Sequence, residues 1–294
     1  MNHWVALDWG TSNFRAYLME NKNVIDQVST QEGMKFVDQK KFENTLIKNI
    51  IPWKKKFDIN IVIASGMVGA KQGWIEVPYI KSPCNISNLN FKTINILDDI
   101  NVHILSGVSQ SNPSDVMRGE ETQIAGFLLN NIDFNGSICL PGTHSKWVKI
   151  ENGNIINFKT FMTGELFEII SKNSILIHSV TSNKILKNEL NKGVDEILKN
   201  PEIFGNALFQ LRADDLINTR GSKILKSKLS GYLLGLELIG SLEFWKKKNI
   251  VLIGNPDLTE LYEYILHNRV NSIKIFLSKD MVLKGLKNFK NKLS

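Results

Sequence analysis

Residues 4–19 decide the fold that the sequence predicts, and they read WVALDWGTSNFRAYLM. An apolar run ends at Asp8, and a second alternating run begins a few residues later. The turn between the two runs is built from Gly10, Thr11 and Ser12. Two such runs joined by a short glycine-containing turn predict an antiparallel pair of strands.

The pattern continues outward from this hairpin. A third run at residues 24–28 completes a meander, and residues 60–65 form a β-branched, apolar run typical of a buried parallel strand. Between them, a helix is expected after a cap at Asp38, with Pro52 disrupting its end. The apolar face of this helix repeats every four residues, at Phe42, Leu46 and Ile50. The predicted order is β-β-β-α-β.

The same plan starts again near residue 137. A strand at 137–140 ends in the turn 141–145, strands follow at 146–150 and 155–161, and a helix begins near Thr163. A long helix, a strand at 250–253, a helix, a strand at 273–277 and a final helix complete the chain. Gly231 and Gly235 in the long helix would permit close helix packing. The repeated plan predicts an α/β protein.

Composition excludes several other classes of protein. The chain has 294 residues, 43% of them hydrophobic, which is too apolar for a disordered chain. Its two cysteines fit a reduced, cytoplasmic compartment. No apolar run is long enough for a membrane span, and the start of the chain resembles a strand rather than a signal peptide. The net charge of +7 is scattered, which argues against nucleic-acid binding.

Two turns have the composition of phosphate-binding loops. In the first, Gly10 allows close approach of a phosphate, Thr11 and Ser12 add hydroxyl donors, and Asp8 is a candidate Mg²⁺ ligand. The second turn offers Gly142, Thr143 and His144, followed by the cation Lys146. A plain hairpin turn, a structural histidine and an exposed strand lysine are the competing interpretations.

Three further segments are candidates for chemistry. Glu120 and Glu121 open a predicted helix, where either could serve as a general base or simply stabilise the helix start. Gly254 and Asn255 follow a strand and could border an adenine ring or form a tight turn. The loop after the strand at 60–65 often holds ligand in α/β proteins, although Trp74 within it could be a packing residue.

These residues together resemble the 2-dehydro-3-deoxygalactonokinase family of the actin-like ATPase and sugar kinase superfamily. The resemblance rests on segments spread in order along nearly the whole chain. They are residues 6–16, 64–69, 72–79, 117–123, 140–148, 161–167, 229–235 and 253–256.

The resemblance implies two ribonuclease-H-like lobes around a central cleft, with domains at 1–132 and 133–294. We leave open that the last helix packs back on the first lobe, and that the protein is a homodimer. The implied activity is ATP- and Mg²⁺-dependent phosphorylation of 2-dehydro-3-deoxy-D-galactonate on its terminal C6 hydroxyl, in galactonate breakdown. The two phosphate turns would face each other and hold one nucleotide.

Substrate contacts follow from the same reading. The anionic sugar acid requires a cation or a helix N-terminus, and the candidate cations are Arg15, Arg118 and Arg212. The sugar pocket is expected to include Ser65, Gly66, Trp74, Thr163, Gly164 and Glu165.

One departure from the superfamily affects the catalytic assignment. The second phosphate turn usually begins with Asp there, whereas Leu140 stands at that position here. The metal-binding or general-base role of that carboxylate is therefore sought at Glu120 or Glu121, with Asp8 as a metal ligand, and the sequence does not choose between the two glutamates. A phosphohydrolase acting on polyphosphate or nucleotide, and a non-catalytic nucleotide sensor, remain as alternatives.

Overall fold

The computed structural model describes residues 3–293 and divides into two compact units. The first unit contains the chain up to Asn135, a short segment Ile150–Phe158 and the chain from Leu277 onward. The second unit contains Gly136–Lys149 and Lys159–Phe276. Each unit is built around its own sheet, and each is described separately below.

The first unit has a six-stranded sheet in the order β3-β2-β1-β4-β8-β7. The strand β1 pairs antiparallel with β2 and parallel with β4, and β4 pairs parallel with β8. The predicted β-β-β-α-β order is confirmed. The bounds are β1 His3–Trp9, β2 Phe14–Glu20, β3 Asn23–Thr30, β4 Ile59–Ser65, β7 Phe91–Ile96 and β8 Ile100–Leu105.

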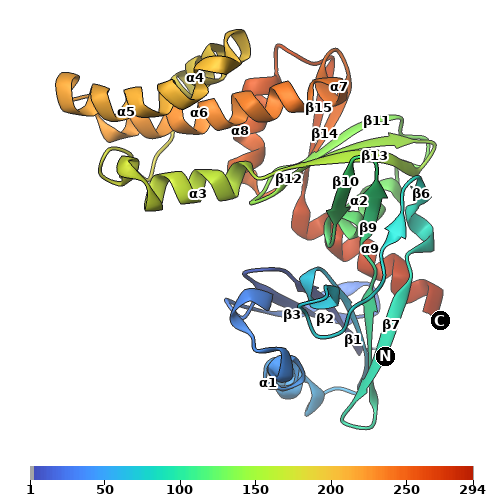
Figure 1. The fold of residues 1–294 in the computed structure, drawn as a ribbon. Helices are drawn as coiled ribbons and strands as arrows, with labels where there is room; N and C mark the ends of the chain where they lie inside the picture. The colour runs from blue at the N-terminus through green and yellow to red at the C-terminus, as the bar shows by residue number, and fades with distance from the viewer. Residues whose placement is uncertain (1–2, 294) are drawn as a thin grey trace. The chain divides into compact units, whose positions relative to one another are not determined.

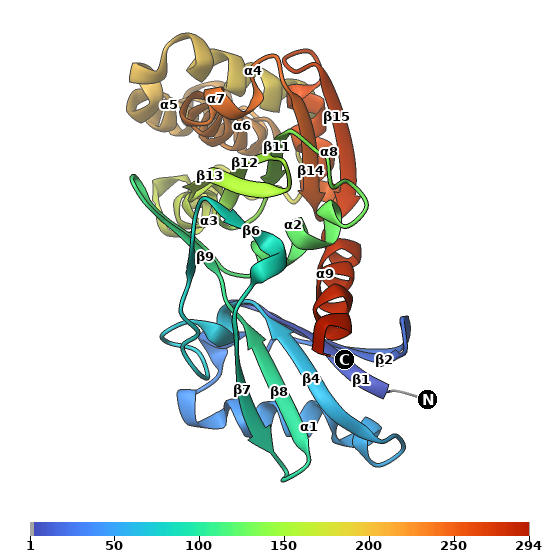
Figure 2. The same cartoon turned by 90° about the vertical axis from the view of Figure 1, so that its right-hand side faces the viewer.

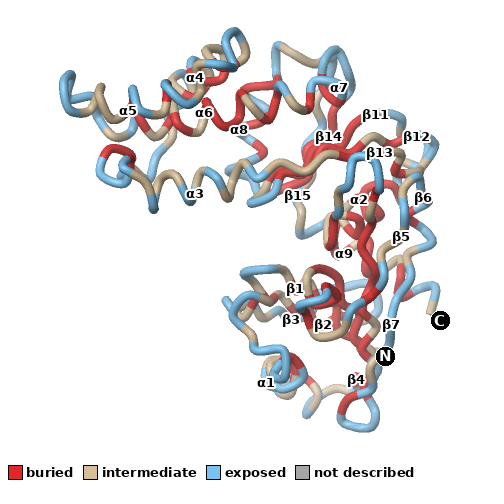
Figure 3. Tube along the Cα trace, viewed as in Figure 1, coloured by how far each residue is buried: buried red, intermediate tan, exposed pale blue. Residues whose placement is uncertain are grey.

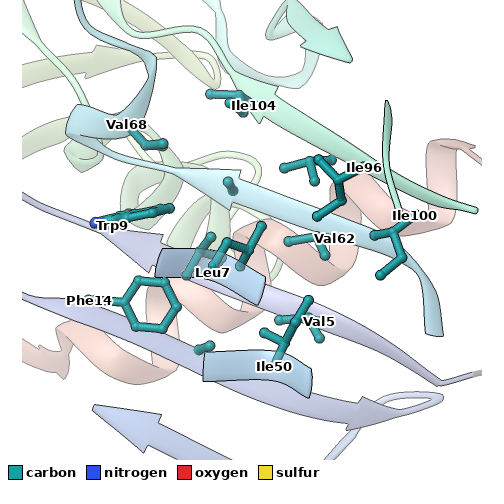
Figure 4. Close-up of a cluster of buried hydrophobic side chains, with 14 of the residues drawn as sticks. Val5, Leu7, Trp9, Phe14, Ile50, Val62, Val68, Ile96, Ile100 and Ile104 are labelled. Atoms are coloured by element: carbon teal, nitrogen blue, oxygen red, sulfur yellow. The ribbon is translucent and has the colours of Figure 1, made fainter. Parts of the chain in front are cut away.

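Helix α1 (Phe42–Lys54) covers one face of this sheet. Figure 4 shows Val5 and Leu7 of β1 in one cluster with Ile50 of α1. Pro52 lies inside α1, so the expectation that it disrupts the helix is wrong. The helix continues to Lys54 because Trp53, in its last turn, is buried against the same core.

The expected cap of α1 also differs. Asp38 accepts a hydrogen bond from the backbone N–H of Lys40 at 3.0 Å and caps a short 3₁₀ turn, Gln39–Lys41. The α-helix begins only at Phe42, directly after this turn. Asp38 therefore caps the 3₁₀ turn and not α1, whose N-cap position is Lys41 without a side-chain cap.

Helix α9 (Ser278–Leu293) packs on the opposite face of the sheet through Val282, Leu286 and their neighbours. It also lies beside α2 (Glu120–Leu128), as Figure 2 shows. A Cβ atom on Gly126 would be 1.9 Å from the carbonyl oxygen of Met281, and one on Gly285 would be 2.1 Å from that of Thr122. The two helix backbones thus touch, and α9 supports the start of α2.

A small second sheet in the first unit was not predicted from the sequence. It has the order β10-β9-β5, with β5 Ile80–Lys81, β9 Val108–Ser111 and β10 Ser114–Met117. A two-residue strand β6 (Cys84–Asn85) pairs antiparallel with β13 (Asn154–Phe161). Gln110 of β9 accepts a hydrogen bond from the backbone N–H of Phe158 at 3.0 Å.

The second unit contains a sheet with the neighbouring strands β15-β14-β11-β12. Figure 1 shows α4, α5 and α6 stacked together in this unit, and Figure 3 shows the many buried residues along α6. The strands are β11 Gly136–Leu140, β12 Ser145–Glu151, β14 Asn249–Gly254 and β15 Ser272–Leu277. The helices are α3 Thr163–Asn173, α4 Lys187–Lys199, α5 Phe204–Asn218, α6 Ser222–Gly240, α7 Leu242–Trp245 and α8 Pro256–Leu266.

The predicted close packing on α6 is confirmed. A Cβ atom on Gly231 would lie 2.2 Å from the carbonyl oxygen of Leu190 in α4, and one on Gly235 would lie 2.8 Å from Ile197. Only glycine lets the two helices approach this closely. Across residues 3–293, no helix has the length and apolar character needed to cross a membrane.

Candidate active site

In the first unit, the site residues gather at the ends of β1, β2 and β4. The pairing register places Asp8 opposite Arg15 on β2 and opposite Ser65 on β4. Arg15 Nη1 donates to Asp8 Oδ2 at 3.0 Å, and the two side chains are 43% and 23% exposed. Burial raises the pKa of Asp8 above its ordinary value, and the positive charge of Arg15 opposes that rise.

The turn after Asp8 is held from both sides. The N–H of Gly10 donates to the carbonyl oxygen of Asn13 at 2.9 Å, which closes the hairpin. The N–H groups of Met34 and Lys35 donate to the carbonyl oxygens of Gly10 and Thr11, each at 3.0 Å. Thr11 and Ser12 are exposed at the tip of the turn, where a ligand can reach them.

Two glycines bring the other predicted segments against this turn. Gly66 has a φ of +98°, and a Cβ atom on it would lie 2.7 Å from the carbonyl oxygen of Trp9. Gly119 has a φ of +112°, and a Cβ atom on it would lie 3.3 Å from the Cα atom of Gly66. Three segments far apart in sequence therefore meet here, and both glycines are required for backbone conformation.

Gly119 places the two acids at the start of α2. Glu120 is half-buried and accepts a hydrogen bond from the backbone N–H of Arg118 at 3.1 Å. Glu121 is 1% exposed and accepts from the N–H of Gly119 at 2.7 Å and from the hydroxyl of Thr122 at 3.1 Å. Burial raises the pKa of Glu121 to about 7, and the charge of Glu120 adds to the rise. The same charge contributes to the raised pKa of Asp8.

Arg118 contacts the loop that follows β4 and holds it in place. Its Nη2 donates to the carbonyl oxygen of Val77 at 2.8 Å, and its guanidinium lies 4.2 Å from the centre of the Tyr79 ring. Within residues 3–293, the buried Nε and Nη1 of Arg118 and the buried hydroxyl of Ser65 have no hydrogen-bond partner. Trp74 is partly buried against the first core, with its ring 6.4 Å from that of Trp9.

In the second unit, two turns lie at the carboxyl ends of adjacent parallel strands. Strand β11 leads into Pro141 and Gly142, and β14 ends at Gly254 and leads into Asn255. A Cβ atom on Gly254 would lie 3.6 Å from Pro141 Cδ. Asn255 caps α8, because its Oδ1 accepts from the N–H of Asp257 at 2.9 Å.

The Gly142 turn also contacts the start of α3. A Cβ atom on Gly164 would lie 2.6 Å from the carbonyl oxygen of Gly142. The N–H of Glu165 donates to the carbonyl oxygen of Thr143 at 3.1 Å. His144 Nε2 lies 2.6 Å from Glu165 Oε2. The structure thus brings the Gly142 turn, predicted to bind the nucleotide, into contact with Gly164 and Glu165, predicted to bind the sugar.

Two of the predicted ligand-binding cations, Lys146 and Arg212, have surroundings that differ from the sequence-based expectation. Lys146 is buried, with its Nζ 3.4 Å from the carbonyl oxygen of His144. Arg212 lies in α5, where its Nη1 donates to Ser179 at 3.1 Å and to Asp215 at 3.0 Å. Arg212 is therefore not gathered with the residues of either turn.

A cavity of about 180 Å³ opens beside the Gly142 turn. Its walls come from α3, α6 and α8 and are mostly apolar. They comprise Gly142, Thr163, Gly164, Phe167, Ile185, Lys226, Ser230, Leu233, Leu234, Leu258, Leu261 and Tyr262. Sequence reasoning missed most of these residues, because an apolar helix face predicts core packing whether or not a cavity lies beside it.

Sequence reasoning also missed Glu237, a buried acid in α6. Its carboxylate accepts hydrogen bonds from Trp147 Nε1 at 2.8 Å, from the hydroxyl of Thr163 and from that of Tyr262 at 2.9 Å. Burial raises the pKa of Glu237, and these hydrogen bonds act in the opposite direction. The detectable signal was a single charged residue in the apolar stretch 233–239.

The fold is shared with proteins of known structure. The chain superposes on a ligand-bound xylulose kinase from Lactobacillus acidophilus with a TM-score of 0.55 at 10% identity, covering 100% of this chain and 90% of that one. The chain therefore shares its fold with that kinase.

The particular family follows from closer similarities. The sequence model described as 2-keto-3-deoxy-galactonokinase matches residues 8–289, and the chain belongs to this family. It is 32% identical over 292 residues to a probable 2-dehydro-3-deoxygalactonokinase from Rhizobium meliloti, covering 97% of this chain and 95% of that protein. A crystal structure assigned as a 2-dehydro-3-deoxygalactonokinase from Sinorhizobium meliloti superposes with a TM-score of 0.90 at 31% identity, over 99% of both chains.

Proposed function

We propose that this chain transfers the γ-phosphoryl group of ATP to the terminal C6 hydroxyl of 2-dehydro-3-deoxy-D-galactonate. Membership of the sugar-acid kinase family supports the reaction class. The observation that carries the residue assignment is the contact made through Gly66 and Gly119, which gathers the Asp8 turn and the two acids of α2. Phosphoryl transfer depends mostly on positioning and on neutralising charge, and this cluster can do both.

The nucleotide is assigned to the second unit. The apolar cavity between α6 and α8 suits a purine ring, and its rim includes Gly142, where backbone can approach phosphate oxygens. Thr143 and His144 follow Gly142 in the same turn and are exposed, and we include them as phosphate contacts. Gly254, which lies against Pro141, and Asn255, which caps α8, are proposed to border the adenine ring. In the first unit, Gly10, Thr11 and Ser12 are the corresponding phosphate contacts.

Glu120 is assigned as the base that accepts the proton of the attacking hydroxyl. It is the more accessible of the two acids, whereas the carboxyl of Glu121 is enclosed and holds the Gly119 N–H. A general base must reach the proton that it removes. Glu121 then acts by holding the bend at Gly119 that orients Glu120.

The donor set of the first unit fits a magnesium ion brought with the nucleotide. Within residues 3–293, no cluster of three or more Asp, Glu, His or Cys side chains could hold a metal by itself. Mg²⁺ is commonly bound by one or two carboxylates together with phosphate oxygens and water. Asp8, with Glu120 close enough to raise its pKa, meets this requirement. The ion would supply neutralisation of charge on the phosphates.

The sugar acid also needs a cation for its carboxylate. Arg15 is the best candidate, since its side chain is 43% exposed beside Asp8. Arg118 is buried under Tyr79, and Arg212 is paired with Asp215. Ser65, Gly66 and the loop carrying Trp74 are proposed to border the sugar.

We also propose the domain boundaries, the cellular location and the oligomeric state of this chain. The sequence boundary at residue 132 lies close to Asn135, and the working domains are proposed as the two units, with α9 in the first. Cytoplasmic location follows the metabolic role and remains a proposal, as does a homodimer.

The test is ADP release from ATP with and without the keto-deoxy sugar acid. The kinase assignment expects release that depends on the acid. Release at the same rate without it would instead support a phosphohydrolase. ATP binding with no turnover under either condition would support a nucleotide sensor.

A further inference from the structure

A buried polar cluster of the second unit lies beside the cavity assigned to the nucleotide, since two of its members line that cavity. Glu237 of α6 is 1% exposed, yet no cation is among the partners that the structure gives its carboxylate. Burying a carboxylate is costly unless hydrogen bonds compensate. A buried cluster of this kind can hold the surrounding elements in one arrangement, so its partners indicate which elements it would hold.

The partners come from three different elements. Trp147 belongs to β12, Thr163 is the first residue of α3, and Tyr262 belongs to α8. The Tyr262 hydroxyl lies 2.9 Å from both carboxylate oxygens and 2.9 Å from the hydroxyl of Ser145, the first residue of β12. One side chain therefore connects α6 to a strand and to two helices.

The same partners form the walls of the cavity. Thr163 of α3 and Tyr262 of α8 both line the cavity. Ser145 directly follows the turn of Gly142 to His144. Beside Thr163, Gly164 packs on the carbonyl oxygen of Gly142. Displacement of Thr163 or Tyr262 would thus change the cavity and the turn together.

We infer that Glu237 is a positioning residue for the nucleotide, which holds the start of α3, the wall residue Tyr262 and the second phosphate turn in one binding-competent arrangement. It does not touch the nucleotide. The inference rests on the proposed function in one respect, namely that this cavity takes the nucleotide.

The informative variant is Glu237→Gln. The amide keeps the size of the side chain and one acceptor oxygen, but an NH₂ group replaces the other oxygen. Because Trp147 Nε1 can only donate, the amide oxygen must face it, and the NH₂ group then faces the Thr163 and Tyr262 hydroxyls, which must change from donating to accepting. Tyr262→Phe removes one donor from the same cluster while keeping the shape of the wall.

The matched control is Glu196→Gln. Glu196 in α4 likewise accepts from a tyrosine hydroxyl, that of Tyr232 at 2.8 Å, and from Lys228 Nζ at 2.9 Å. It connects α4 to α6, as Glu237 connects α6 to its own neighbours, but none of the three residues Glu196, Lys228 and Tyr232 lines the cavity. A merely structural effect should therefore lower the Tm in both glutamine variants without distinguishing their affinity for nucleotide.

The experiment is calorimetric titration of the full chain with ATP and Mg²⁺ in the absence of sugar acid, with Tm measured in parallel. The Kd for ATP should rise about 10-fold in Glu237→Gln and rise in Tyr262→Phe, as expected for displacement of binding groups by less than 1 Å. Glu196→Gln should change it less than about twofold. In steady state, the KM for ATP should rise more than the KM for the sugar acid.

The outcomes separate this inference from the proposed reaction. An unchanged ATP Kd in Glu237→Gln, or an equal rise in Glu196→Gln, would overturn the positioning role. Failure of the unaltered chain to bind ATP would overturn both the nucleotide cavity and the positioning role. If ATP binds with the predicted pattern but no sugar acid is phosphorylated, the positioning role stands and the proposed acceptor is wrong.

Discussion

Arg15 donates a hydrogen bond to Asp8 across the paired strands β1 and β2, at 3.0 Å between Nη1 and Oδ2. The register of the hairpin places the two residues opposite each other, so their contact follows directly from the strand pairing. Burial raises the pKa of Asp8 and Arg15 opposes this rise. The arginine therefore favours an ionised Asp8, the form that can bind a metal ion.

Asp8→Asn should abolish most turnover without unfolding the protein. Asparagine keeps the shape and relieves the cost of burying a charge, but it is a poorer Mg²⁺ ligand. We expect kcat to fall at least ~100-fold, on the order of other losses of a charge-positioning group, with a Tm within a few degrees. Asp99→Asn, at an exposed acid paired with Lys54, is the control and should retain activity. A near-normal kcat in Asp8→Asn would remove this residue from the catalytic machinery.

The two acids of α2 should respond differently to the same change. Glu120→Gln removes the proposed base, so kcat should fall ~100-fold or more while the KM for ATP changes little. Glu121→Gln should cost less, because the amide oxygen can still accept from the Gly119 N–H. Steady-state kinetics of the two variants decide the assignment. The larger loss in Glu121→Gln would reverse the roles proposed for these two residues.

Glu121 should also make stability depend on pH. Its pKa in the folded state, about 7, lies above the usual glutamate value of 4.5, so the folded state binds the proton more tightly. The stabilising contribution is complete below about pH 4.5 and is lost as the pH rises toward 7. The shift corresponds to about 3 kcal/mol at most.

Urea unfolding of wild type and Glu121→Gln between about pH 5 and pH 8 measures this contribution. The stability of the wild type relative to the variant should decrease as pH rises. Glu43→Gln, at an exposed position in the first turn of α1, serves as the control for changing a surface charge. A difference between wild type and Glu121→Gln that stays flat over this range would show that Glu121 titrates normally.

Gly164→Ala should weaken nucleotide use through the second turn. The added Cβ would lie 2.6 Å from the Gly142 carbonyl oxygen and 2.8 Å from Thr143 Cα, so the turn must move. We expect the KM for ATP to rise about 10-fold. Gly205→Ala, in the first turn of α5 with no atom within 4 Å of its Cβ, should leave the KM unchanged and the Tm equal or higher. Equal KM values in the two variants would contradict the role of the Gly142 turn.

The fold was predictable where the strands are long and buried. The first meander and the strand at 59–65 alternate or run apolar because one or both faces meet the core, and that burial shapes the sequence. Strands β9 and β10 were missed because their sequences, VSQS and SDVM, are short and polar and resemble a loop. The end of α1 was misjudged because the packing of Trp53 outweighs the local cost of Pro52.

The candidate site was partly predictable for a similar reason. Gly66, Gly119 and Gly142 stand out because turns and close backbone approaches require glycine, and those requirements are local. The walls of the cavity come from residues as far apart in the sequence as Gly142 and Tyr262, and Glu237 accepts a hydrogen bond from Trp147, 90 positions away. Arg212 was wrongly included among the candidates for binding the substrate. It pairs with Asp215 three residues along the same helix, and no candidate turn lies in that helix.

The central claim is that this chain phosphorylates the terminal hydroxyl of 2-dehydro-3-deoxy-D-galactonate. The most direct measurement is a proton-coupled ³¹P NMR spectrum of the product formed from ATP, Mg²⁺ and this sugar acid. A phosphate monoester on the terminal CH₂ should give a triplet, because its phosphorus couples to two methylene protons. Inorganic phosphate as the only new signal, or a doublet from phosphate on a ring or chain CH, would contradict the account.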